Sequence, residues 1–197
     1  MLERGELQRW FPDDKLLVVP ESVLPAQLSH GPTRRLLSEV GVPESFLEVM
    51  ELDFHLVERV RRVGDIYRKY DEEPPDGTGD LIYLGFAGQV FLAIDGPTGR
   101  VLQVAREFGS RLLASSLESF LRVLGVVSGE VLRYQRARRA SRRFRFGWLR
   151  GYDDPRQFAE RLNAIALRRL RRQDPGALPA AEPAWRSLLA DIAANAS

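Results

Sequence analysis

The sequence predicts an α+β fold, in which an antiparallel sheet is followed by helices. Apolar and β-branched runs at residues 81–86, 90–94 and 100–104 are separated only by short turns rich in glycine. Connections this short can join antiparallel strands but cannot provide the crossover that parallel strands need. From residue 115 onward the apolar residues recur at helical spacing, so we expect a helix to cover one face of the sheet.

Short elements are expected before the sheet. The β-branched run at residues 15–20 predicts an edge strand or an extended entry to the core. Thr33 precedes a segment with helical spacing at residues 34–40, as a helix-capping residue would. Pro43 fits the first turn of a second short helix, which we expect over residues 44–49.

Three helices are expected after the sheet. Ser115 and Glu118 have the spacing of a capping box at the start of the first one. The acidic residues and proline at 153–155 predict the start of the second, and an Asp-Pro pair at 174–175 predicts its end. The last is expected around residues 185–192, where the apolar side chains share one face.

The length and the charge distribution suggest how the chain is organised. We expect an α+β domain at residues 1–130 and an arginine-rich helical C-terminal extension, residues 131–197, that packs on the same body. Residues 1–120 hold 13 basic and 20 acidic side chains, whereas residues 121–197 hold 16 basic and 7 acidic ones. The overall net charge of +2 therefore hides a bipolar chain.

The composition excludes several classes of chemical site. There is no cysteine, which rules out disulfides, thiolate metal ligands and a thiol nucleophile. His30 and His55 are the only histidines, and their spacing does not match a metal-binding pair. No serine lies in Gly-x-Ser-x-Gly, and neither glycine-rich phosphate motif is present. We therefore expect no catalytic residue and no metal, with His30 as a loop residue that hydrogen-bonds the backbone.

The sequence gives no sign of export or membrane insertion. The first 15 residues carry charge throughout and lack the apolar stretch of a secretory signal. The longest apolar stretches, such as residues 123–127, fall far short of the roughly 18 residues that span a bilayer. We expect a soluble cytoplasmic protein with no membrane partner.

The densest basic segment holds seven arginines between Arg133 and Arg145, with no acidic residue among them. Clustered guanidinium groups bind phosphate, so contact with nucleic acid or with an acidic protein is one interpretation. The other is a solvated helix whose arginine stems cover apolar surface. Because the acidic part of the chain would repel a phosphate backbone, we do not expect nucleic acid to be a partner. The candidate basic surface consists of Arg138, Arg139, Arg142 and Arg143.

The densest acidic segment falls in an expected loop that is rich in proline and glycine, at residues 72–79. Five carboxylates lie within ten positions there: Asp71, Glu72, Glu73, Asp76 and Asp80. One interpretation is an ordinary solvated loop. The other is a surface presented to a basic protein partner, where opposite charge accelerates the encounter. Composition leaves both interpretations open.

Several short segments occur in an order that is typical of one family. They are Leu24-Pro25, HGPTRRLL from His30, VGVP from Val40, GDLIYLGF from Gly79, VFL from Val90, DGPTGRV from Asp95 and SSLESF from Ser115. In this order they resemble the SUKH immunity-protein superfamily, specifically its fourth group. The resemblance covers roughly residues 15–127, about the span of one domain.

The resemblance implies an α+β fold with a curved, mostly antiparallel sheet flanked by helices, without enzymatic activity or cofactor. Members of the superfamily resemble antidotes encoded beside bacterial polymorphic toxins, commonly nucleases or nucleic-acid deaminases. The implied function is to bind such a toxin and neutralise it by occlusion. From its charge, we expect the acidic loop, with the neighbouring strands, to contact the toxin. The alternative is a nucleic-acid-associated or regulatory adaptor that uses the basic C-terminal segment.

Overall fold

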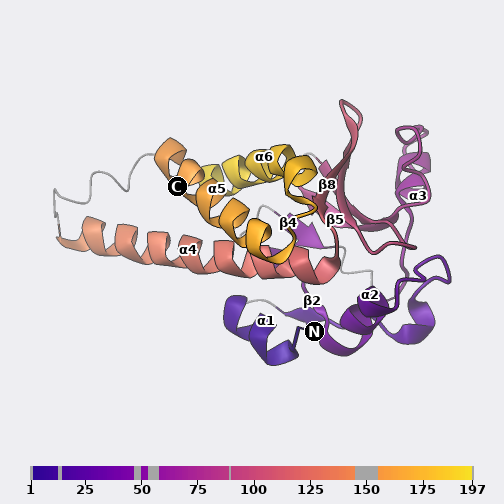
Figure 1. The fold of residues 1–197 in the computed structure, drawn as a ribbon, viewed down its shortest axis with the longest axis horizontal. Helices are drawn as coiled ribbons and strands as arrows, with labels where there is room; N and C mark the ends of the chain where they lie inside the picture. The colour runs from indigo at the N-terminus through magenta and orange to yellow at the C-terminus, as the bar shows by residue number, and fades with distance from the viewer. Residues whose placement is uncertain are drawn as a thin grey trace.

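The computed structural model of the chain describes residues 2–12, 15–46, 50–52, 58–88, 90–144 and 155–196. They form an α+β fold in which an antiparallel sheet lies between one short helix and three long helices (Figure 1). The predicted fold class, including the helical C-terminal part, is confirmed.

The main sheet is a six-stranded meander in the order β3-β4-β5-β6-β7-β8. The predicted runs become β5, β6 and β7, while β8 was not predicted. Its sequence, GSRLLA, contains no β-branched residue, and pairing with β7 along its whole length makes it a strand. The bounds are β3 (Ser45–Phe46), β4 (Met50–Leu52), β5 (Ile82–Ala87), β6 (Val90–Ile94), β7 (Val101–Ala105) and β8 (Gly109–Ala114).

The sheet is apolar on both faces. Along β6, Leu92 and Ile94 enter the main core, whereas Phe91 and Ala93 belong to a second cluster on the opposite face. Successive side chains of a strand point to opposite sides, so each face needs its own cover. The inner face, toward the main core, is covered by the long helices, and the outer face by the short helix α3 (Val63–Arg68).

The helices on the inner face are α4 (Leu117–Phe144), α5 (Pro155–Gln173) and α6 (Leu178–Ala196). The fully buried Trp185 of α6 donates its indole N–H to the carbonyl of Leu113 on the edge strand β8, at 2.8 Å. Tyr134 of α4 stacks on Phe158 of α5, with ring centroids 3.9 Å apart. The three helices were predicted, and α5 ends before Asp174 as expected, but α4 and α6 are longer than the predicted segments.

A smaller layer at the N-terminal end packs below the sheet (Figure 1). The second helix predicted there, over residues 44–49, is wrong. Val42 and Pro43 pair with Leu17 and Leu16 in a two-stranded sheet, and β3 follows at once, so tertiary pairing overrides the helix-starting preference of the proline. Residues 47–49 lie outside the described residues. The elements are α1 (Arg4–Trp10), β1 (Leu16–Leu17), η1 (Glu21–Val23), α2 (Gly31–Arg35), η2 (Leu36–Val40) and β2 (Val42–Pro43).

Replacing Trp185 with phenylalanine should lower the free energy of unfolding by about 2 kcal/mol, because the Leu113 carbonyl loses its indole partner and a small void remains. Urea unfolding monitored by circular dichroism measures the change. Arg186→Ala, one residue along the same helix, is the matched control and should cost less than about 0.5 kcal/mol, since its ion pair with Glu182 is exposed. Equal stability of Trp185→Phe and wild type would contradict the role assigned to the indole.

Candidate functional site

The acidic loop connects α3 to β5 and is firmly attached to both. The buried Thr78 donates its hydroxyl to the carbonyl of Pro75 at 2.7 Å, which fixes the turn. The carbonyl of Gly79 accepts the backbone N–H of Gly64, at the start of α3, at 3.0 Å. This framework leaves the predicted carboxylates on the surface, all of them exposed: Asp71, Glu72, Glu73, Asp76 and Asp80.

Two of these carboxylates are neutralised by arginines of neighbouring elements. Glu72 forms an ion pair at 2.6 Å with Arg106, in the turn between β7 and β8. Asp80 pairs with Arg62 at 3.2 Å. Among the described residues, Asp71, Glu73 and Asp76 have no ion-pair partner. The structure therefore brings the five predicted residues onto one loop but leaves only part of their charge unbalanced.

Helix α3 is fixed at its first turn by Asp65. Its carboxylate accepts the backbone N–H of Arg62 at 3.1 Å and pairs with the side chains of Arg62 and Arg68. Partial burial would raise the pKa of Asp65, but the backbone hydrogen bond and the two arginines outweigh it and hold the pKa below its usual value.

The outer side of the sheet carries an aromatic group that the sequence did not predict. Tyr67 of α3 and Tyr83 of β5 each meet Phe91 of β6 edge to face, with ring centroids 5.4 Å apart. The guanidinium of Arg106 lies over the Tyr67 ring, 5.6 Å from its centroid. Burial raises the pKa of the Tyr67 hydroxyl. These rings join α3, the sheet and, through Arg106, the acidic loop.

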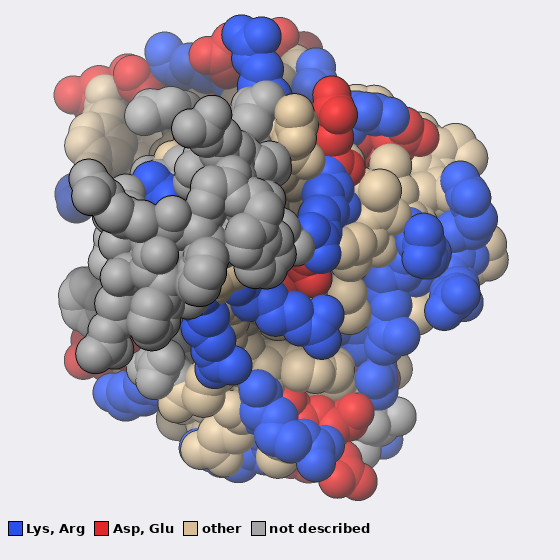
Figure 2. Space-filling model, turned by 90° about the vertical axis from the view of Figure 1, so that its left-hand side faces the viewer, with Lys and Arg blue, Asp and Glu red and all other residues tan. Residues whose placement is uncertain are grey.

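The predicted basic surface lies at the other end of the molecule and is larger than expected. Arg138 and Arg139 lie on α4, while the side chains of Arg142 and Arg143 are outside the described part. Figure 2, which faces this end, shows lysine and arginine over much of the described surface. Helix α5 adds exposed arginines beside those of α4: Arg156, Arg161, Arg168, Arg171 and Arg172. The helical spacing of Arg161, Arg168 and Arg172 was readable in the sequence, but their position beside α4 was not.

Part of this basic charge is structural. Glu130 of α4 is only 7% exposed. Its carboxylate forms ion pairs with Arg161 of α5 at 2.5 Å and with Arg133 at 3.4 Å. Arg169 has a lowered pKa, first because of burial and then because Arg122 and Arg172 lie nearby. Some of the arginines therefore stabilise the packing of α4 and α5, which is a structural role and not a ligand-binding one.

His30 has a structural position. Its ring Nδ1 lies 2.8 Å from the hydroxyl of Thr33, and its backbone N–H donates to the carbonyl of Gly96 at 3.1 Å. The ring packs so closely on Gly99, whose φ is +73°, that a Cβ there would lie 2.2 Å from Nδ1. His55 lies outside the described residues. Within the part of the chain that the structure describes, no three His, Asp or Glu side chains form a group that could hold a metal ion.

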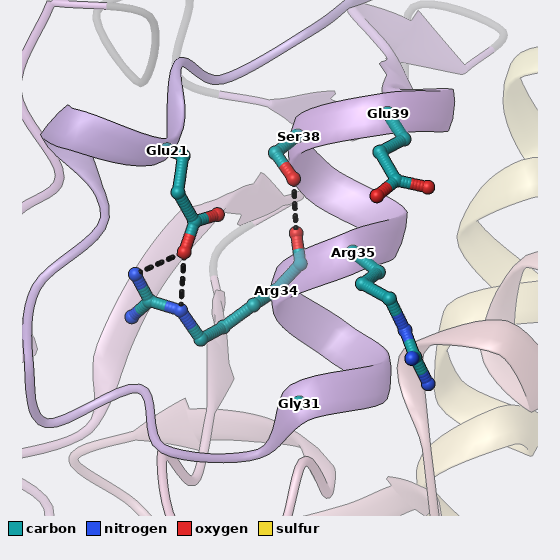
Figure 3. A pocket seen from close by; sticks show the side chains of 6 residues that line it. All are labelled: Glu21, Gly31, Arg34, Arg35, Ser38 and Glu39. Atoms are coloured by element: carbon teal, nitrogen blue, oxygen red, sulfur yellow. Dashed lines mark hydrogen bonds and ion pairs between the residues drawn. The ribbon is translucent and has the colours of Figure 1, made fainter.

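A shallow pocket of about 630 Å³ lies beside α2 (Figure 3). Arg34 reaches across it to the carboxylate of Glu21, with N–O distances of 2.6 and 2.8 Å, and also donates to two backbone carbonyls. Figure 3 shows Arg35 extending away from this pair. Because the central guanidinium is fully engaged, the pocket offers little to a ligand. Its lining residues are Glu21, Gly31, Arg34, Arg35, Ser38 and Glu39.

Comparison with known families decides what kind of protein carries these surfaces. A sequence model of the SUKH-4 immunity protein family matches residues 2–191. The chain belongs to this family. The match confirms the resemblance and extends beyond residues 15–127 into α6. It supports an immunity function and implies a cognate toxin as the partner. No curated protein and no solved structure matches the chain.

Of the helices that the structure describes, none combines the length and the apolar character needed to cross a membrane.

The cap of α3 predicts a pH-dependent contribution to the stability of this immunity protein. Asp65→Ala should lower the free energy of unfolding by about 1 kcal/mol at pH 7. Since the folded-state pKa of Asp65 is lowered, the stabilisation is present above the unfolded pKa of about 3.9 and is lost as the pH falls through the folded value. Urea unfolding of both proteins at pH 7 and at about pH 2.5 should show the difference shrinking. A difference that stays constant would contradict the charge-based cap.

Proposed function

We propose that this immunity protein binds a nucleic-acid-directed toxin, a nuclease or a deaminase, and neutralises it by covering the active site or the substrate groove. The observation that carries the proposal is the family match over nearly the whole chain, residues 2–191. In this role the protein is not an enzyme and needs no cofactor. It acts in the bacterial cytoplasm, where such a toxin would meet its nucleic-acid substrate.

The acidic loop is the proposed contact, and charge is the reason. A toxin that acts on nucleic acid needs a cationic groove for the phosphates of its substrate. Asp71, Glu73 and Asp76 are exposed and have no ion-pair partner among the described residues, so they can face such a groove without breaking a contact. Exposed carboxylates of this kind act mainly on the rate of encounter, because their attraction extends over a Debye length of about 8 Å.

Reversing the charge of the loop should slow association. We expect the triple variant Glu72→Lys, Glu73→Lys and Asp76→Lys to reduce the association rate at least tenfold, or about 1.4 kcal/mol. Its melting temperature should change little, because the ion pair that the variant removes, Glu72 with Arg106, is exposed and exposed charges contribute little to folding. The probe is the toxin domain encoded beside the gene of this chain, with its catalytic residue inactivated, and the measurement is surface plasmon resonance. Protection of cells that express the active toxin is the parallel readout.

The matched control reverses three exposed arginines at the other end of the molecule. Arg139→Glu, Arg171→Glu and Arg172→Glu change the net charge by the same amount with opposite sign, and they should leave the association rate within about threefold of wild type. If the lysine variant associates and protects as well as wild type while the arginine variant fails, the toxin docks on the basic helices and the proposed contact is wrong.

The second candidate, a nucleic-acid adaptor, is favoured by one observation, the arginines that α4 and α5 present together (Figure 2). Two features count against it. Glu130 already neutralises part of that charge. In addition, the large exposed apolar side chains of the described residues, Tyr70 and Phe86, lie outside these helices. Among the side chains that the structure describes on α4 and α5, none is an exposed aromatic on which a base could stack.

Affinity for nucleic acid should therefore be weak. We expect a Kd at or above about 10⁻⁶ M for a DNA duplex of roughly 30 base pairs at physiological salt, the range of purely electrostatic binding. Fluorescence anisotropy over a series of salt concentrations measures it. Submicromolar binding with a steep salt dependence would instead support the adaptor function.

A further inference from the structure

The side of the molecule that carries α3 exposes two large apolar side chains, one on the sheet and one just after the helix. Among the described residues, the exposed large hydrophobic side chains are Tyr70, at 64%, and Phe86, at 40%. Both lie on the side of the molecule that carries α3. An isolated exposed aromatic residue needs no explanation, but two beside one partly covered aromatic group indicate a contact surface.

Phe86 continues the aromatic group across the sheet. It is the cross-strand partner of Phe91 on β6 and, on its other side, of Glu51 on β4. Phe91 in turn contacts Tyr67 and Tyr83 edge to face. These four rings therefore adjoin one another across the sheet and α3. Tyr70 comes three residues after Tyr67 and is joined to it by a backbone hydrogen bond, so we count it with them in the aromatic face, which consists of Tyr67, Tyr70, Tyr83, Phe86 and Phe91.

Helix α3 covers only part of this face. Tyr67 and Tyr83 are both buried, at 6% exposure. Phe86 pairs across the strands with Phe91, which Tyr67 contacts, but the Phe86 side chain itself is open to solvent. Tyr70 follows directly after α3, where its backbone N–H donates to the carbonyl of Tyr67 at 2.9 Å. Phe86 is thus flanked by the partly buried ring of Phe91, its cross-strand partner, while the ammonium of Lys69 lies over the Tyr70 ring, 5.6 Å from its centroid. Exposed rings held next to packed ones can serve as binding anchors.

The charges around the aromatic face indicate the chemistry of its partner. The cations nearby are engaged within the chain. Arg106 pairs with Glu72, Arg62 with Asp65 and Asp80, and Arg68 with Asp65. Arg61 lies over the Tyr83 ring and Lys69 over the Tyr70 ring. The acidic loop keeps three unpaired carboxylates, and exposed Glu51 adds a fourth beside Phe86. A surface that complements this arrangement is basic at its edge and apolar at its centre.

We propose that the aromatic face is the centre of the toxin-binding surface and that the acidic loop is its rim. The proposal rests on the proposed function, and its occupant is the toxin itself, through a basic surface that places an apolar side chain on Phe86 and Tyr70. The two parts then act on different rates. The carboxylates accelerate association, while the rings, desolvated only in the complex, determine how slowly the complex dissociates.

The experiment separates these two rates. Phe86→Ala combined with Tyr70→Ala should raise the dissociation rate from the immobilised, inactivated toxin domain by about thirtyfold and leave the association rate within about threefold. The triple lysine variant of the acidic loop should show the opposite pattern. Surface plasmon resonance at physiological and at raised salt measures both, and only the association rate should respond strongly to salt.

Two controls keep the test independent of folding. Tyr70→Ala alone, at a side chain that is 64% exposed, should keep the wild-type melting temperature and still raise the dissociation rate several-fold. Tyr70→Phe keeps the ring and should dissociate as wild type does. If Phe86→Ala weakens folding, the dissociation rates of Tyr70→Ala and Tyr70→Phe test the proposal without it.

The outcomes distinguish the two proposals. If the wild-type protein neither binds this toxin domain nor protects against it, the proposed function fails. If wild type binds and protects while the double alanine variant keeps the wild-type dissociation rate, the proposed function stands and the aromatic face is not the centre of the interface. A loss confined to the arginine control would place the toxin on α4 and α5 and would also overturn the inference.

Discussion

The constraint on which the structure depends is that its main sheet is apolar on both faces. Leu92 and Ile94 point to one side of β6, and Phe91 and Ala93 to the other. Neither face can be left in water without losing most of the burial that drives folding, about 25 cal/mol for each Å² of apolar surface. The chain therefore has to supply two layers of helix, and the unequal size of these layers sets the location of the candidate site.

The inner layer is complete and the outer layer is not. On the inner face α4, α5 and α6 bury a continuous core that ends in Trp185 under the edge strand. On the outer face the six residues of α3 reach Tyr83 and Phe91 but leave Phe86 open. A partner can dock most favourably where apolar surface is held rigid and still uncovered, which is why the outer face, rather than the more heavily charged helices, is the place to look for the toxin.

The sequence revealed what is local and missed what depends on pairing. Turn residues between short apolar runs predicted β5, β6 and β7, and a contiguous set of carboxylates predicted the exposed loop. Strand β8 and the strand that replaced the expected helix at residue 44 depend on partners far away in the sequence, which no local preference encodes. The aromatic face was missed for the same reason, because Tyr67 and Phe91 are 24 positions apart and meet only after α3 folds onto the sheet.

The bipolar charge of the sequence becomes a polarity in space because of this same layering. The arginine-rich helices cover the inner face and extend away from the sheet, while the acidic loop is fixed to α3 on the outer side (Figure 1). Because charges of opposite sign are separated in this way, the electric field of a basic partner orients the molecule. In the proposed complex, a cationic groove on the toxin would be attracted by the loop and repelled by the helices, so the outer face would make contact first. The acidic loop would then orient the two proteins during their encounter, and the adjacent aromatic face would slow the dissociation of the complex.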